Sequence, residues 1–108
     1  MFNDFNFNGV ATHPTSLVTT SFSGSTVTFS FSHQRIHNTN TGFVVGLQRF
    51  TNGVWHWVHG SSMNFTSTST VQNTEVIFSS TYNGVYRLNI SSPDAQRSSI
   101  SNGRVRVR

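Results

Sequence analysis

Two tryptophans and a histidine recur at every second position, at Trp55, Trp57 and His59. Alternate side chains of a β-strand lie on one face, so we expect these three rings to lie on the same side of a strand. Exposed indoles form a flat apolar surface with N–H donors, which suits stacking on sugar rings or bases. The spacing is typical of tryptophans in the core or at a subunit interface, and a polysaccharide-binding surface formed by these three residues is the alternative interpretation.

Histidine is the main candidate for metal binding in this chain, which has no cysteine. A strong zinc motif needs closely spaced histidines with a cysteine or acidic partner. No pair of histidines shows that spacing, and we expect no metal site and no cofactor. The histidines stand at His13, His33, His37, His56 and His59.

Carboxylates are the commonest acid and base groups of enzymes, and this chain has only Asp4, Glu75 and Asp94, far apart in the sequence. The chain also lacks the Gly-x-Ser-x-Gly, His-Glu-x-x-His and phosphate-binding glycine motifs. The sequence thus predicts no catalytic residue, and we expect a protein that is not an enzyme.

Seven basic residues, all arginine, give the chain a formal net charge of +4. Arg104, Arg106 and Arg108 alternate with valines, so they share one face of the last predicted strand. The other arginines are scattered, which falls short of the clustered positive charge of a nucleic-acid-binding protein. We expect no nucleic-acid partner, and we interpret the last strand as an edge strand that is solvated or forms an interface.

The elements that would position these residues are strands. Asn-Gly pairs at residues 8–9, 52–53, 83–84 and 102–103 are strong turn signals, and β-branched or aromatic segments lie between them. The clearest hairpin joins residues 43–50 to residues 54–59. We predict an all-β chain, a single β-sandwich of about eight or nine short antiparallel strands with jelly-roll or immunoglobulin-like connectivity. The expected core residues are Val27, Phe29, Phe31, Phe43, Val45, Leu47, Val76, Phe78, Tyr86, Leu88, Ile90, Val105 and Val107.

The N-terminal segment has a pattern of its own, in which Phe5 and Phe7 alternate with asparagines. We divide the chain into an extended arm, residues 1–14, and a sandwich domain, residues 15–108. The arm has three possible placements: the first strand of its own sheet, an added strand in a neighbouring subunit, or a disordered tail. In the second case Phe2, Phe5, Phe7 and Val10 would form the subunit interface.

Residues 2–15 and the spacing of the strands resemble the subunits of Bacillus endospore appendages, which are pilus-like fibres. The resemblance implies a jelly-roll structural protein that self-assembles through a donor strand into a homo-oligomer or filament on the cell or spore surface. Better-known members crosslink through cysteines in the arm, and this chain has none. Assembly here would therefore rely on strand addition and buried aromatic rings.

Two hypotheses follow from the sequence: a fibre subunit, which we take as the main one, and a carbohydrate-binding module that uses Trp55 and Trp57. Both predict an extracellular or surface location. The first residues lack the basic and apolar regions of a signal peptide, and no apolar run is long enough for a membrane span. We therefore expect neither a signal peptide nor a membrane span.

Overall fold

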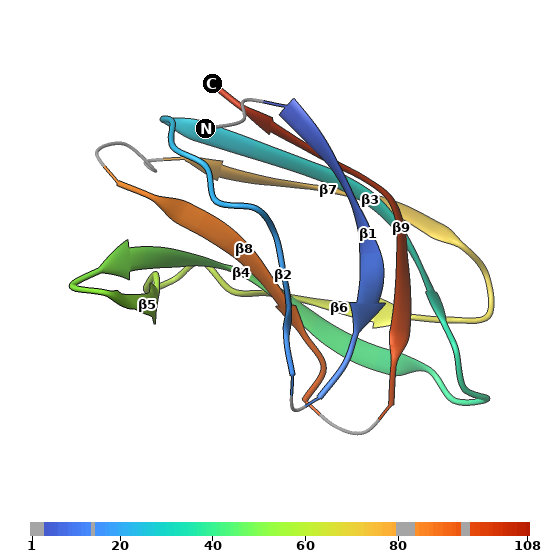
Figure 1. Ribbon diagram of the computed structural model, residues 1–108. Helices are drawn as coiled ribbons and strands as arrows, with labels where there is room; N and C mark the ends of the chain where they lie inside the picture. Colours follow the sequence, from blue (N-terminus) through green and yellow to red (C-terminus); the bar gives the residue numbers. More distant parts are fainter. Residues whose placement is uncertain (1–3, 14, 80–83, 94–95) are drawn as a thin grey trace.

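The computed structural model describes residues 4–13, 15–79, 84–93 and 96–108. Phe2 and Asp94 lie outside these ranges. The described residues form nine strands (Figure 1), which are β1 (Asp4–Ala11), β2 (Leu17–Val18), β3 (Thr26–Arg35), β4 (Thr41–Thr51), β5 (Val54–Trp57), β6 (Met63–Ser67), β7 (Gln72–Ser79), β8 (Tyr86–Ser91) and β9 (Ser98–Val107).

The strands form two antiparallel sheets. Sheet A has the order β1-β9-β3-β7, and sheet B has the order β2-β8-β4-β5, with β6 also paired to β4. β5 and β6 lie one after the other along the same edge of β4, because β5 pairs with residues 48–51 and β6 with residues 41–45. The all-β sandwich of about nine strands is therefore confirmed. No helix that could cross a membrane occurs in the described ranges.

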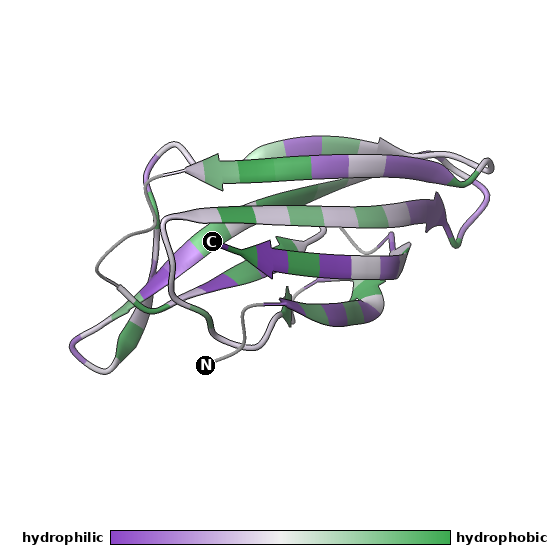
Figure 2. Ribbon diagram, turned by 90° about the horizontal axis from the view of Figure 1, so that it is seen from above, coloured by the Kyte–Doolittle hydropathy of each residue, from purple (hydrophilic) through white to green (hydrophobic). Residues whose placement is uncertain are grey.

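The core lies between the two sheets and follows the period of two in each strand. On β3, Phe29 is fully buried, while its neighbours Thr28 and Ser30 are only half-buried. Figure 2 shows the same alternation of apolar and polar positions along the strands. Every core residue that the sequence predicts is buried, and Phe22 and Ile100 join them. Alternation places these residues correctly because each sheet packs only one of its faces against the other.

Strand β1 completes sheet A of its own chain. It pairs with β9 along most of its length, with Phe5 opposite Val105. The ring centroids of Phe5 and Phe22 are 6.4 Å apart, and those of Phe7 and Phe29 are also 6.4 Å apart. Both rings of the N-terminal segment thus cover the core of the chain that carries them. The predicted insertion of this strand into a neighbouring subunit was wrong.

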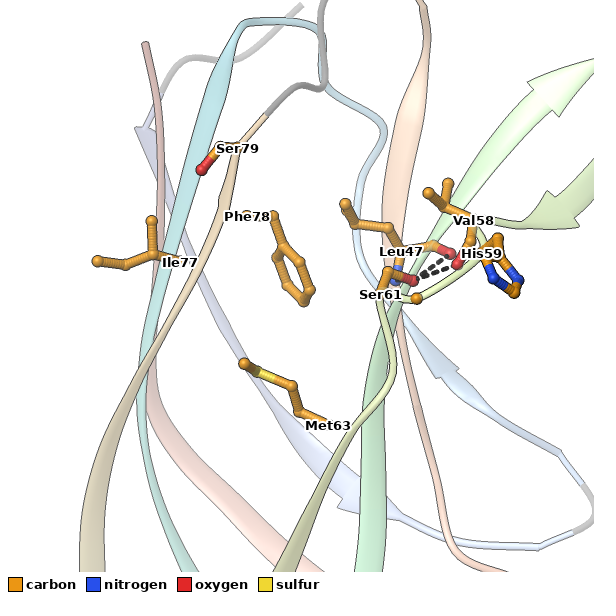
Figure 3. A pocket seen from close by; sticks show the side chains of 9 residues that line it. Leu47, Val58, His59, Ser61, Met63, Ile77, Phe78 and Ser79 are labelled. Atoms are coloured by element: carbon orange, nitrogen blue, oxygen red, sulfur yellow. Dashed lines mark hydrogen bonds between the residues drawn. The ribbon is translucent and has the colours of Figure 1, made fainter.

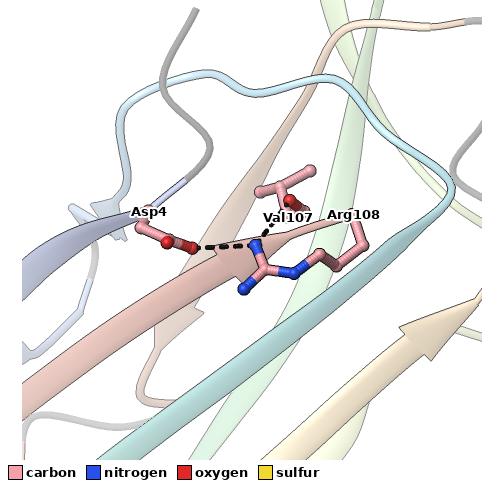
Figure 4. A network of polar contacts seen from close by, with 3 residues as sticks. All are labelled: Asp4, Val107 and Arg108. Carbon is pink, nitrogen blue, oxygen red and sulfur yellow. Dashed lines mark hydrogen bonds and ion pairs between the residues drawn. The ribbon is translucent and has the colours of Figure 1, made fainter.

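An ion pair also joins the start of β1 to the residue that follows β9, its neighbour in sheet A. Asp4, the first residue of β1, accepts a hydrogen bond from Nη1 of Arg108, with 3.2 Å between Asp4 Oδ1 and Nη1 (Figure 4). The same nitrogen donates to the carbonyl oxygen of Val107 at 3.1 Å. Both side chains of the ion pair are exposed, so the pair contributes little to stability.

Val10, the remaining described residue of the predicted interface, is half-buried and lies opposite Ser99.

Strand β9 lies inside sheet A, with β1 on one side and β3 on the other. The expectation that Arg104, Arg106 and Arg108 belong to an edge strand was therefore wrong. Arg104 and Arg106 project from the outer face of the sheet, and the sequence alone does not show that β1 returns to cover the far side of this strand.

The Asn-Gly pairs have two different roles. Asn52 and Gly53 form the predicted turn between β4 and β5, with φ of 54° and 79°. The pairs at 8–9 and 102–103 instead lie within β1 and β9, where the register of the ladder shifts. At Gly103 a Cβ atom would collide with the carbonyl oxygen of Phe7, so this bulge requires glycine. Asn83 lies outside the described residues.

Candidate functional site

The outer face of sheet B carries the predicted tryptophans. On β4, Val45 and Leu47 point into the core, so Gly46 and Gln48 lie on the outer face. Gln48 lies opposite Trp57 of β5 on one side and opposite Arg87 of β8 on the other. We call the surface formed by Gln48, Phe50, Trp55, Trp57, Arg87 and Asn89 the aromatic face.

Trp57 is the most accessible indole of this face, with 50% of its surface exposed. Its ring lies over Gly46, because a Cβ atom at Gly46 would come within 2.7 Å of Cζ3 of Trp57. The six-membered ring of the indole therefore lies against the strand backbone at Gly46. The exposed remainder offers a flat apolar surface to a ligand.

Trp55 is half-buried, because other side chains already occupy its surroundings. Phe50 lies directly opposite it on β4, with 5.1 Å between ring centroids and an angle of 60° between the rings. Cζ of Arg87 lies 4.3 Å from the Trp55 ring centroid, within the range of a cation–π interaction. Phe50 is itself 45% exposed, so it extends the apolar surface toward the tip of the hairpin.

A polar row runs beside the indoles. Gln48 Oε1 accepts hydrogen bonds from Arg87 Nε at 2.8 Å and from Asn89 Nδ2 at 3.2 Å. Gln48 and Asn89 are buried, and burial also lowers the pKa of the Arg87 guanidinium, which stays charged near neutral pH. The aromatic face therefore combines an apolar ring surface with a fixed cationic donor, an arrangement that suits a flat ligand rich in hydroxyl groups.

His59 does not extend the row of tryptophans. Strand β5 ends at Trp57, and a turn follows in which Gly60 has a φ of 75° and Ser61 N donates to the carbonyl oxygen of Val58. His59 lines a hollow of about 260 Å³ together with residues of β4, β6 and β7 (Figure 3). The period of two ends with the strand, so it does not carry His59 onto the aromatic face.

The hollow beside His59 is a weaker candidate for a binding site. Leu47 and Phe78, which line it, belong to the buried core, and Met63 and Ile77 add further apolar surface. Figure 3 shows Ser61 already hydrogen-bonded: its Oγ donates to the carbonyl oxygen of Val58 in its own turn and also accepts from Leu47 N of β4. The described residues also contain no group of three histidine or acidic side chains that would hold a metal ion.

Sequence reasoning missed four members of the aromatic face: Gln48, Phe50, Arg87 and Asn89. The position of the Asn52-Gly53 turn places Phe50 opposite Trp55, so Phe50 could have been predicted from the sequence. Arg87 and Asn89 could not have been predicted, because nothing in the sequence shows that β8 pairs with β4.

No protein-family model matches the chain, and no curated protein matches it. Solved structures do resemble it. One, reported as "CBM4 structure and function", has a TM-score of 0.62 at 14% identity and covers 95% of this chain and 61% of its own. The CBM22-1 xylan-binding domain of Paenibacillus barcinonensis Xyn10C has a TM-score of 0.61 at 14% identity and covers 96% of this chain and 85% of its own.

The tandem CBM22-1-CBM22-2 domain of the same Paenibacillus protein also matches, with a TM-score of 0.61 at 15% identity. It covers 94% of this chain and 38% of its own, so this chain corresponds to one part of that longer protein. These similar structures are carbohydrate-binding modules, and at such identities they establish a shared fold. The fibre-subunit hypothesis, with its pilus-like and spore-appendage assembly, is corrected by this finding together with the pairing of β1 in its own sheet. The chain shares a β-sandwich fold with these solved structures.

Proposed function

We propose that this chain is a carbohydrate-binding module that holds a polysaccharide on the aromatic face of sheet B. The observation that carries the proposal is the half-exposed indole of Trp57, supported from below by Gly46 and flanked by the polar row of Gln48 and Arg87. Sugar rings have apolar faces that stack on such an indole and hydroxyl edges that bond to such polar groups.

The structural neighbours favour the same function, since one of them is described as a xylan-binding domain. We infer a non-catalytic, extracellular role, because structural polysaccharides such as xylan lie outside the cell. Trp57 would stack on a sugar ring, and Phe50 and Trp55 would extend the contact along the hairpin. Self-association of the chain stays a prediction from the sequence.

Affinity electrophoresis tests the proposal. Migration of the folded chain should be slowed by soluble xylan in a native gel, and the same chain should be retained on insoluble xylan. Bovine serum albumin is the control for non-specific retardation. Migration that is unchanged across xylan, cellulose derivatives and mixed-linkage glucan would overturn the proposal.

A further inference from the structure

The guanidinium of Arg87 is fixed on the aromatic face from two directions. Its Nε donates to Gln48 Oε1 at 2.8 Å, and its Cζ lies 4.3 Å from the ring centroid of Trp55. Gln48 is held in turn by Asn89 at 3.2 Å, and both amides are buried. The cation therefore has a defined position before any ligand arrives, which reduces the entropy lost on binding.

This cation has no carboxylate partner among the described residues. The ion pair that occurs among the described residues joins Arg108 to Asp4 in sheet A. Glu75 also belongs to sheet A, on β7, where its Oε2 lies 3.5 Å from Ser30 Oγ. Sheet B thus carries a partly desolvated positive charge that its own described residues leave without an opposite charge. A ligand anion would supply one.

The free groups of Arg87 match a carboxylate. Nε and one face of the guanidinium are already used, which leaves the two η nitrogens. A planar guanidinium bonds two carboxylate oxygens through parallel N–H donors, and its geometry distinguishes it from a simple point charge. The backbones of Trp57 on β5 and Arg87 on β8 are separated by Gln48 of β4, and the side chain of Arg87 crosses β4 to reach Trp55. Trp55 and Trp57 lie two residues apart on the same face of β5, so the guanidinium and the Trp57 ring are within reach of one ligand.

We propose that the polysaccharide held on this face carries carboxylate groups, as uronic acid units do, and that Arg87 binds one of them through its η nitrogens while a sugar ring stacks on Trp57. This inference rests on the proposed function and names the ligand class of the same site. Arg87 is then the residue that makes the site selective for acidic over neutral polysaccharides.

The test compares one polymer in two states. Glucuronoxylan and the same glucuronoxylan with its carboxylates chemically reduced to hydroxymethyl groups differ in charge and share the same backbone. Affinity electrophoresis or calorimetry should show that the unmodified chain binds the native polymer about tenfold more tightly than the reduced one. Dextran sulfate measures general attraction to polyanions, and we expect it to bind more weakly than native glucuronoxylan.

Substitutions then assign the selectivity to Arg87. Arg87→Gln should lower the affinity for native glucuronoxylan to that for the reduced polymer, and Arg87→Lys, which keeps the charge and loses the planar donors, should recover only part of the difference. Arg104→Gln is the matched control, because Arg104 is exposed on sheet A and should leave the selectivity intact. Thermal melting of each variant checks that it is folded.

Each outcome bears on a different part of the proposal. Equal binding of the native and reduced polymers by the unmodified chain would overturn the carboxylate inference and leave the carbohydrate-binding proposal standing. An Arg87→Lys variant as selective as the unmodified chain, or dextran sulfate bound as tightly as glucuronoxylan, would overturn recognition through the two η nitrogens. Binding to neither polymer, with migration also unchanged by cellulose derivatives and mixed-linkage glucan, would overturn the proposed function itself.

Discussion

Trp57 lies directly over Gly46, so closely that a single added carbon at Gly46 would come within 2.7 Å of the indole Cζ3. The second close atom, Oγ of Ser62, would be 3.3 Å away. The nearest obstacle is therefore the outer end of a side chain and not the backbone. A residue larger than glycine here would displace the indole while leaving the strand in place.

Gly46→Ala should therefore reduce polysaccharide binding with little loss of stability. The added methyl group pushes Trp57 away from the strand, and we expect the affinity for xylan to fall about threefold to tenfold. Gly42→Ala is a matched control on the same strand, because its Cβ would lie 3.8 Å from the nearest atom, the carbonyl oxygen of Phe65. Affinity electrophoresis and thermal melting check both variants; an equal loss of binding in the two would contradict the role given to Gly46.

Removal of the exposed indole should have the larger effect. Stacking of a base on an aromatic side chain contributes about 1–3 kcal/mol, and with the same range for a sugar ring Trp57→Ala should weaken xylan binding about fivefold to 150-fold. The melting temperature should change little, because Trp57 is half-exposed. His56→Ala, on the opposite face of the same strand, is the control and should bind as the unmodified chain does. Unchanged binding in Trp57→Ala would exclude the aromatic face as the site.

The sequence predicted features that depend on local alternation, and it missed those that depend on which strands become neighbours. The buried positions of β3 and the turn at Asn52-Gly53 follow from local pattern and backbone preference. The position of β9 inside sheet A requires β1 to return from the other end of the chain. The pairing of β8 with β4, which brings Arg87 to Trp55, is likewise a long-range contact.

The Asn-Gly pairs show the same limit at a finer scale. This dipeptide favours positive φ, and Asn102 indeed has a φ of 51°. Positive φ serves a hairpin turn and a β-bulge equally well, so the dipeptide alone does not distinguish a strand end from a shift in register. The pairing of β9 with both β1 and β3, with a shift in register against each, shows that Asn102-Gly103 forms a bulge within the strand and not a turn at its end.

Phe7 provides a test of the placement of β1. Its ring packs edge-on against Phe29 in the core, so Phe7→Ala should lower the free energy of unfolding by about 2 kcal/mol, below the range for a fully buried phenylalanine. Asn6→Ala, at an exposed position of the same strand, should cost much less. Urea denaturation followed by tryptophan fluorescence measures both. A Phe7→Ala variant of unchanged stability would contradict the packing of β1 on its own chain.

His33 is a titratable group held inside the sandwich. Only 4% of its surface is exposed, its ring packs against Phe31, Phe43 and Phe65, and its Nδ1 lies 2.9 Å from Ser67 Oγ. Desolvation by this burial lowers the pKa of His33 below its ordinary value of 6.5. The neutral imidazole is therefore the form that the folded state favours.

The free energy of unfolding should fall on acidification for this reason. With the folded-state pKa below that of the unfolded chain, the unfolded state binds more protons between the two values. The contribution of His33 is complete above pH 6.5 and is lost as the pH falls from 6.5 toward the lowered pKa, below which the loss levels off. Each unit by which folding lowers the pKa of His33 corresponds to a loss of about 1.4 kcal/mol in the free energy of unfolding.

Urea denaturation between pH 7.5 and pH 5 measures this loss. His33→Gln, which does not titrate in that range, should be less stable than the unmodified chain at pH 7.5 and should lose less stability on acidification. His56→Gln, at an exposed position, is the control and should retain the full pH dependence. The titration of the His33 ring by NMR should give a midpoint below 6.5. A midpoint above 6.5, or equal pH dependence in His33→Gln and the unmodified chain, would show that burial of His33 does not control the acid sensitivity.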